Sequence, residues 1–310
     1  MVLADLIVGK FLRNLYFKQT SGLYYRTTYA IDSTEAEVLI FGSSRANHHY
    51  VPEIFEETLK LSCYNTGRDG NSILYNYAIF ESVIKRYSPK LIILDIVPGD
   101  MSFSDYSYER LTSLLPYYKD HPEIRETVHL RGQFEKYKLI SSIYPFNSSL
   151  ITILIGTSEL NKERKPDIKG YIPLYGIMQD TIPVRKSFSS DKLDKNKLQA
   201  LEAIFKTCNE KGVQIVLVTS PYFAQIEMDY SQNLVSELCD KYQIDFLDYS
   251  KSDVFINSAT SFVDFQHLNQ EGAIMFSKIT ATVINQKIKR DTLDDDIVLG
   301  AWNILPEISK

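Results

Sequence analysis

The sequence has few cysteines and no excess of positive charge. Its three cysteines, Cys63, Cys208 and Cys239, form no Cys-x-x-Cys pair and lie among apolar residues. Such a set is a poor disulfide framework and is typical of buried thiols. The net charge of −5 provides no overall positive field to attract nucleic acid or anionic lipid, although a local basic patch remains compatible with it. We therefore expect no nucleic-acid partner.

Nucleotide-binding and metal-binding motifs are also missing. The chain contains no P-loop, no Gly-x-Gly-x-x-Gly after a predicted strand and no cluster with metal-ligand spacing. It has no internal repeat and no low-complexity tract. We expect neither a cofactor nor a metal. Its 310 residues, 44% of them hydrophobic and 24% charged, have the composition of a globular protein, and they predict one large domain with insertions.

The chain begins with an apolar stretch. The run from Met1 to Lys10 is too short to cross a bilayer, and no basic region precedes it. Two interpretations of residues 1–36 are equally open. They contain either the remnant of a membrane anchor, which would tether the full-length protein, or the first turn of a docking helix.

Short apolar runs alternate with helical patterns along most of the chain. Residues such as those in 73–84 and 198–208 are apolar at helical spacing. The apolar runs, which are typical of parallel strands buried on both faces, are residues 37–41, 62–64, 90–97, 213–219 and 245–248. The alternation predicts an α/β fold with a doubly wound parallel sheet, which places ligands at the carboxyl ends of its strands.

Two segments depart from this rhythm. Residues 101–193 contain several prolines and no clear buried strand, and they predict a mostly helical insertion into a domain that spans residues 37–290. Such an insertion is either a lid over the site or a packed structural excursion. Residues 291–310 follow the last predicted helix, and we expect them to form a C-terminal tail that wraps the surface.

A serine-rich turn follows the first predicted strand. The stretch from Phe41 to Asn47 reads Phe-Gly-Ser-Ser-Arg-Ala-Asn. A hydroxyl there lies at the carboxyl edge of the sheet and close to the start of the next helix, where backbone N–H groups stabilise a developing oxyanion. Taken alone, a serine in such a turn caps the helix more often than it acts as a nucleophile.

A second motif, Asp264-Phe-Gln-His267, comes just before the last helical pattern. A carboxylate three residues before a histidine can orient the imidazole as a general base for a serine. Taken alone, the pair is better explained as a solvated aspartate and a histidine that caps the helix.

The two motifs together, in this order on an alternating scaffold, resemble the SGNH (GDSL-like) hydrolase family. The resemblance spans residues 37–100 and 213–285. It implies a flavodoxin-like three-layer α/β/α sandwich with a central parallel sheet of about five strands. The substituted motifs look closest to a Bacteroides-type branch of envelope-associated proteins and to acetyltransferase-like relatives that modify polysaccharides.

The resemblance also implies roles for residues of both motifs. The nucleophilic serine of the family follows glycine and aspartate, and this chain has Gly42-Ser43-Ser44 at the matching place. Ser44 is therefore the implied nucleophile, with Ser43 as the alternative. The Asp-x-x-His of the family carries over to Asp264 and His267, which complete the implied catalytic triad.

The oxyanion hole matches the family only in part. The family has a glycine whose N–H lines the hole, and the segment 65–70 implies Gly70 for this role. The family's third block ends in Asn-Asp, but this chain has Val-Pro-Gly-Asp at 97–100 and lacks the asparagine donor. Such a donor contributes roughly 3 kcal/mol to the transition state. Asn71, Asn47 or Arg45 could substitute for it.

Other polar residues near the motifs have alternative interpretations. Arg45 and Arg68, with Asn47, are candidates for binding an anionic substrate group, although paired structural arginines are equally common. We interpret Asp95 as a buried carboxylate that holds loop amides. A further pair follows Ser44 on the predicted helix. His48 and His49 face different directions because they are adjacent, so they are poor candidates for one metal site.

These observations lead to one functional hypothesis with two rivals. We expect a serine esterase that removes an acyl group, O-acetyl above all, from a carbohydrate in the periplasm or cell envelope. The first rival is a polysaccharide O-acyltransferase that uses the same triad. The second is a non-catalytic glycan-binding module on the same scaffold.

Overall fold

The computed structural model describes residues 2–158, 167–179, 184–187, 192–227 and 230–302. Five parallel strands form the central sheet, in the spatial order β2-β1-β3-β5-β7. They are β1 (Val38–Phe41), β2 (Cys63–Asn65), β3 (Leu91–Asp95), β5 (Gln214–Thr219) and β7 (Asp245–Asp248). This order is that of flavodoxin-like folds, which confirms the predicted fold class and all five strands.

Helices cover both faces of the sheet because its strand residues are apolar on both sides. Leu39 and Phe41 belong to a core with helices on one face, whereas Val38 and Ile40 belong to the core of the other face. The first face is covered by α2 (Gly22–Asp32), α5 (Ile73–Arg86), α10 (Lys195–Lys211) and α11 (Tyr230–Tyr242). The second is covered by α3 (Ser44–His49), α4 (Pro52–Leu59), α12 (Asp253–Ile256), the 3₁₀ turn η4 (Ala259–Ser261) and α13 (Gln270–Trp302).

The N-terminal helices belong to the domain rather than to a separate segment. Ala30 and Ile31 of α2 and Tyr16 of α1 (Val2–Phe17) are buried in the first core. The expected boundary at residue 36 is therefore not a structural boundary. Sequence patterns missed it because these helices have a mixed polar and aromatic composition and bury only one side. Among the described residues, no helix is both long and apolar enough to cross a membrane.

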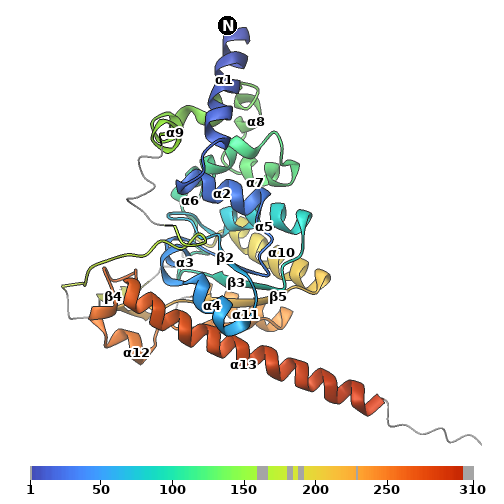
Figure 1. The fold of residues 1–310 in the computed structure, drawn as a ribbon, viewed down its shortest axis with the longest axis vertical. Helices are drawn as coiled ribbons and strands as arrows, with labels where there is room; N and C mark the ends of the chain where they lie inside the picture. Colours follow the sequence, from blue (N-terminus) through green and yellow to red (C-terminus); the bar gives the residue numbers. More distant parts are fainter. Residues whose placement is uncertain (1, 159–166, 180–183, 188–191, 228–229, 303–310) are drawn as a thin grey trace, which may run out of the picture.

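The insertion is mostly helical, as predicted, and its first part packs against α1 and α2 (Figure 1). Its last part contains a strand that was not predicted. Residues Val184–Ser187 form β4, which pairs in parallel with β6 (Ala224–Glu227) in a separate two-stranded sheet. The helical elements are α6 (Asp105–Arg110), η1 (Leu111–Tyr117), η2 (Pro122–Ile124), α7 (Arg125–His129), α8 (Glu135–Lys138), η3 (Tyr144–Ser149) and α9 (Leu150–Thr157).

The expected C-terminal wrap is not what the described residues form. Helix α13 continues without interruption to Trp302, past the predicted boundary at residue 290, and it extends away from the sheet (Figure 1). The run of acidic residues around Asp295 contains no proline or glycine that would end a helix there. Residues 303–310 of the predicted tail lie outside the described residues.

Candidate active site

Ser44 lies where the sheet changes winding direction. The chain leaves β1 at Phe41, and β1 pairs with β2 on one side and with β3 on the other. Ser44 is the first residue of α3, with Ser43 as the residue that precedes the helix. In doubly wound sheets this switch point at the carboxyl edge is where ligands bind. The structure thus places the candidate nucleophile at the expected edge.

The turn before Ser44 depends on Gly42. Its φ of +150° is a backbone conformation that favours glycine. A side chain at this position would bring Cβ to 2.8 Å from the backbone oxygen of Asp95 and 2.7 Å from Cβ of Ala46. Only glycine therefore lets the turn pass between β3 and α3.

Asp264 and His267 lie in a tight loop that leads into α13. The N–H groups of Gln266 and His267 donate to Oδ1 of Asp264, at 2.7 and 2.9 Å. The same carboxylate faces the imidazole, with Nδ1 of His267 at 2.9 Å from Oδ2. One aspartate thus closes the loop and orients the histidine ring.

The structure brings Ser44 to this histidine. Oγ of Ser44 lies 2.8 Å from Nε2 of His267. Because Nδ1 faces a carboxylate, it carries the proton, and Nε2 accepts the hydrogen bond from the serine hydroxyl. The three side chains form one hydrogen-bonded row from hydroxyl to carboxylate. This is the geometry that a Ser-His-Asp triad requires. Ser43 makes no such contact among the described residues and serves as the residue before α3.

The electrostatics of the row keep the carboxylate charged. Desolvation of Asp264 acts to raise its pKa, but hydrogen bonds from His267 and from the backbone of Gln266 outweigh it, so the pKa is lowered from its usual value. The side chains of His267 and Asp264 are 22% and 50% exposed. The row is therefore open to water on the side of the aspartate.

The loop after β2 lies beside α3, and Asn65 holds it there. Nδ2 of Asn65 donates to the backbone oxygens of Ala46 and Tyr50, at 2.7 and 3.0 Å, and its Oδ1 accepts from the N–H of Gly67. Farther along the loop, Gly70 has a left-handed φ of +71°. The asparagine of this block is thus a structural clip that positions the glycine-containing loop next to Ser44.

The side chains of Asn71 and Asp100 are engaged elsewhere and do not replace the missing donor. Nδ2 of Asn71 donates to the backbone oxygen of Asp69 at 3.2 Å, within its own loop. Asp100 accepts from the N–H of Ile73 at 3.2 Å and therefore caps α5. The buried ammonium of Lys197 donates to the backbone oxygens of Asp100 and Ser102, at 2.7 and 2.9 Å. The third block thus supports the loops and contributes no side-chain amide.

Arg45 supports the site from the protein interior and does not face an open surface. It is 1% exposed, its Nε donates to Oγ of Ser220 at 3.1 Å, and its guanidinium lies 3.5 Å from the ring centre of Tyr222. Its Nε is also 3.8 Å from Asp95.

Asp95 accepts from the N–H of Ser220 at 3.1 Å and from the hydroxyl of Tyr50 at 2.6 Å. The prediction that Asp95 holds loop amides is confirmed.

Asn47 is also buried and bonded within the protein, which corrects its expected role in substrate binding. Its Nδ2 donates to the backbone oxygen of Gly170 at 2.6 Å, and its own backbone oxygen accepts from the N–H of Ile172 at 3.1 Å. Residues 167–179 of the insertion therefore run along α3. Local sequence could not show this burial of Arg45 and Asn47, because their hydrogen-bond partners Ser220 and Gly170 are more than 100 residues away.

The two histidines after Ser44 have separate tasks. Nδ1 of His48 is 2.7 Å from the backbone oxygen of Ile172, and its Nε2 is 3.2 Å from Asp69. Nε2 of His49 accepts from the N–H of Leu268 at 3.0 Å, and its Nδ1 is 2.9 Å from Oγ of Ser220.

His49 thus holds the residue that follows His267. Sequence reasoning missed this role, along with those of Ser220 and Lys197. Across the described part of the chain, no group of three or more acidic, histidine or cysteine residues could hold a metal.

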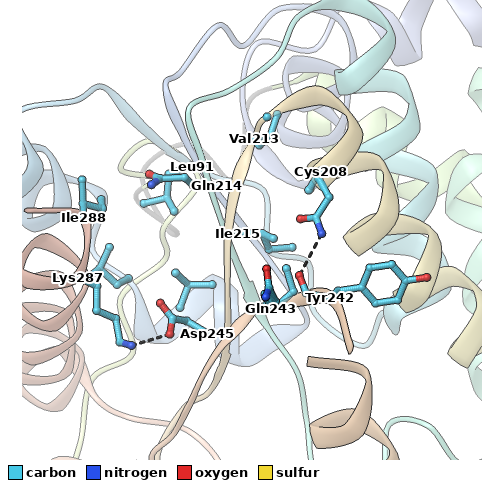
Figure 2. Close-up of a pocket in the computed structure, with 15 residues that line it drawn as sticks. Leu91, Cys208, Val213, Gln214, Ile215, Tyr242, Gln243, Asp245, Lys287 and Ile288 are labelled. Atoms are coloured by element: carbon cyan, nitrogen blue, oxygen red, sulfur yellow. Dashed lines mark hydrogen bonds and ion pairs between the residues drawn. The ribbon is translucent and has the colours of Figure 1, made fainter. Parts of the chain in front are cut away.

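A cavity of about 400 Å³ lies at the opposite edge of the sheet. Figure 2 shows Leu91, Gln214 and Asp245 around it, and these residues begin or adjoin the amino ends of β3, β5 and β7. Lys287 closes it through a 2.6 Å ion pair with Asp245. Because Ser44 follows the carboxyl end of β1, this cavity is not part of the candidate site.

Comparisons with known proteins find distant similarity among solved structures. No protein-family model and no curated protein matches the chain. Among solved structures, the chain is similar to a provisionally assigned lipolytic protein of the G-D-S-L family from Desulfitobacterium hafniense DCB-2. The two are 11% identical, the match covers 80% of this chain and 99% of the other, and the TM-score is 0.38. The interpretation of the site rests on its geometry and not on this similarity.

Proposed function

We propose that the protein is a serine esterase of the SGNH type that removes an O-acetyl or similar small acyl group from a carbohydrate. The supporting observation is the hydrogen-bonded row of Ser44, His267 and Asp264 at the carboxyl edge of a flavodoxin-like sheet. Nothing else among the described residues joins a hydroxyl, an imidazole and a carboxylate at that edge.

In the proposed mechanism, Oγ of Ser44 attacks the ester carbonyl while Nε2 of His267 accepts its proton. The ionised Asp264 stabilises the resulting imidazolium and keeps its Nδ1 oriented. His267 then passes the proton to the leaving sugar hydroxyl, and a water activated by the same imidazole releases the acyl group as an acid. We assign the backbone N–H groups of Ser44 and Gly70 to the oxyanion.

Water access favours hydrolysis over transfer to a second sugar. The Asp264 side chain is half exposed, so water can approach the row. A transferase with the same triad must keep water away from the acyl-enzyme. The 2.8 Å contact between Ser44 and His267 also argues against a non-catalytic glycan-binding module, which has no use for an activated serine. We place the activity in the periplasm or cell envelope, where acylated glycans are accessible.

The test is hydrolysis of para-nitrophenyl acetate, with covalent labelling by a fluorophosphonate as a second readout. We expect Ser44→Ala and His267→Ala to lose about six orders of magnitude in kcat, which puts them at the background of the assay, while they fold normally by circular dichroism. Ser43→Ala is the matched control, and it should keep its label. A wild-type protein that is folded yet neither hydrolyses the ester nor reacts with the phosphonate would refute the esterase.

A further inference from the structure

A pocket of about 630 Å³ lies beside the loop that follows β2. Arg68 and Asn71 of this loop line one side of it, and Arg110, at the end of α6, lines another. Arg131 and Ser149 of the insertion complete the wall. None of these residues belongs to the triad, so the pocket is a separate feature next to the candidate site.

The same loop connects this pocket to the triad. The N–H of Arg68 donates to the backbone oxygen of Gly42 at 3.2 Å, two residues before Ser44. The next residue, Asp69, contacts His48, whose ring centre is 5.9 Å from that of His267. The pocket and the turn that carries Ser44 therefore share this loop.

The pocket has an excess of positive charge. Arg68 is 5% exposed, and its guanidinium is held by the hydroxyl of Thr27 and by the rings of Tyr24 and Tyr75, with no carboxylate partner among the described residues. A buried charge without a counterion costs free energy, which an anionic ligand would recover.

The other charged groups of the wall do not cancel this excess. Arg110 contacts the hydroxyl and the ring of Tyr106 and has no carboxylate partner among the described residues, so its charge is also uncompensated. Arg131 pairs with Glu135 at 2.8 Å, and Glu109 is the one carboxylate on the wall of the pocket. Two uncompensated arginines thus face a single exposed glutamate.

We propose that this pocket binds an anionic group, a carboxylate or a phosphate, on the carbohydrate whose ester Ser44 cleaves. The inference rests on the proposed esterase function and names the substrate class as an acylated acidic glycan. Arg110 is the exposed arginine of its wall. A Cβ placed on Gly70 would lie 2.9 Å from Nη2 of Arg110, so the guanidinium lies beside the glycine that we assign to the oxyanion.

The experiment compares two substrates that differ only in charge. O-acetylated oligogalacturonide carries a carboxylate on each sugar, and its methyl-esterified form carries none; acetate release is measured for both. We expect wild type to prefer the charged form in kcat/KM, and Arg110→Gln to lose about tenfold of that preference, the value of one charge-assisted hydrogen bond. Lys206→Gln, which removes one charge from the outer surface of α10, is the matched control and should keep the preference.

Two further arms separate the possible outcomes. The first arm compares acetylated glycerol 3-phosphate with acetylated glycerol. If the charged form is preferred here, while the charged galacturonide is not preferred over its methyl ester, the preferred anion is phosphate. Titration of each charged ligand into Ser44→Ala by calorimetry measures binding without turnover. Binding that Arg110→Gln weakens would support the pocket even if no hydrolysis occurs. Active enzyme with no preference for either anion would overturn the pocket while leaving the esterase intact.

A second feature, independent of the pocket, lies at the end of the molecule that carries the N-terminus. Helices α1, α8 and α9 meet there (Figure 1). Asp5 of α1 accepts from Oγ of Ser141 and the N–H of Ser142, at 2.6 and 2.7 Å, just after α8. Ile153 of α9 is buried in the same core as Tyr16 of α1. Three elements from different parts of the chain thus form one joined surface.

Large apolar side chains are exposed all over this surface, which we call the apolar end. They are Val2, Leu3, Leu6, Ile7, Val8, Phe11, Phe134, Tyr137, Ile140, Leu150, Ile151 and Leu154. Its exposed charges are all positive on the three helices, namely Lys10, Lys136 and Lys138. The acidic residues there are otherwise engaged, because Asp5 is bonded as described and Glu135 is buried beside Arg131.

We infer that the apolar end docks on the surface of an anionic lipid bilayer. Apolar groups with interspersed lysines bind such a surface through burial and charge attraction together, and a tyrosine suits the interface. The charge argues for this occupant, because a protein of net charge −5 exposes Lys10, Lys136 and Lys138 where its apolar side chains protrude, and the acidic partner of Lys138, Glu135, is buried. The proposed binding is peripheral.

Cosedimentation with vesicles tests the docking. We expect wild type to sediment with vesicles of phosphatidylcholine mixed with phosphatidylglycerol, less with phosphatidylcholine alone, and less at high salt. The double change Ile151→Glu and Leu154→Glu should reduce the bound fraction at least about tenfold, because both side chains are exposed and their loss leaves the core intact. Val254→Glu, an exposed apolar residue of α12, is the control and should bind like wild type.

Equal sedimentation of wild type and the double variant would overturn the docking. A dimer in light scattering that the double variant converts to a monomer, with no vesicle binding by either protein, would also overturn it and identify a second copy of the chain as the occupant.

Discussion

Oγ of Ser44 lies 2.8 Å from Nε2 of His267, although 223 residues separate them in the chain. The contact arises because Ser44 follows β1, while the loop of His267 is held against the same edge by His49 and by α13. A serine that merely capped α3 would have no reason to meet an imidazole whose far nitrogen faces a carboxylate.

Asp264→Asn should reduce kcat/KM by about 10³- to 10⁴-fold at neutral pH. The amide can still accept from the N–H groups of Gln266 and His267, so the loop should persist, but its NH₂ favours the wrong tautomer of His267. The measurement is ester hydrolysis alongside a circular dichroism spectrum. Wild-type activity in Asp264→Asn would exclude the assigned role of the carboxylate.

The pH profile of kcat/KM should fall on the acid side with the slope of a single proton. The pKa of Asp264 is held below its usual value, since its hydrogen bonds outweigh the desolvation that opposes them, so the carboxylate stays ionised across the working range. A profile measured from about pH 4 to 9 in buffers of constant ionic strength tests this. A two-proton slope would mean that Asp264 titrates in the working range.

His49→Ala should lower the free energy of unfolding by about 2 to 4 kcal/mol and reduce kcat. It leaves the N–H of Leu268 and the hydroxyl of Ser220 without their partner and opens a space in the core. His49→Gln offers an acceptor and a donor on one side chain and should recover most of the activity. Urea unfolding and ester hydrolysis of both variants are the measurements, and equal kcat in Ala and Gln variants would argue against a positioning role.

The stability of wild type should fall more than that of His49→Gln between pH 7.5 and 5.5, by about 1 kcal/mol. Burial, reinforced by the charge of Arg45, lowers the pKa of His49 well below the ordinary 6.5. Below about pH 6.5 the unfolded chain therefore binds a proton that the folded protein excludes. The stability that neutral, buried His49 contributes is present above that pH and is lost as the pH drops. His121, whose pKa is raised by its hydrogen bond to Asp32, acts in the opposite direction but is common to both proteins.

Gly42→Ala should destabilise the protein more than Gly132→Ala. The two glycines have similar φ values of +150° and +156°, so both substitutions carry backbone strain of about 1 to 3 kcal/mol. A Cβ at Gly132 meets nothing within 4 Å, whereas one at Gly42 meets the backbone of Asp95. We expect Gly42→Ala to cost at least about 2 kcal/mol more in urea unfolding. Equal costs would mean that β3 moves freely away from the turn.

The sequence by itself determined the strands and the chemistry at their ends. Apolar runs such as 37–41 and 213–219 form strands because both of their faces can only be buried between helical layers. Once the strands are parallel, the residues that follow them share one edge. Ser44 follows the first strand directly, whereas Asp264 comes well after the last strand, so the two motifs were paired through their order on the alternating scaffold and their resemblance to the SGNH family.

Only the tertiary structure decided which polar residues face that edge. Arg45 and Asn47 look like ligand contacts in sequence. In the structure both are buried, because Arg45 bonds to Ser220 just after β5 and Asn47 bonds to Gly170 of the insertion. Arg68, in contrast, lines a pocket. His49 was a poor metal candidate in the sequence, which gave it no other role, and in the structure it holds the histidine loop. The burial of a side chain and its hydrogen-bond partners depend on segments that are distant in the chain. A local sequence pattern can therefore predict a helix or a strand, but it does not determine which residues surround each side chain.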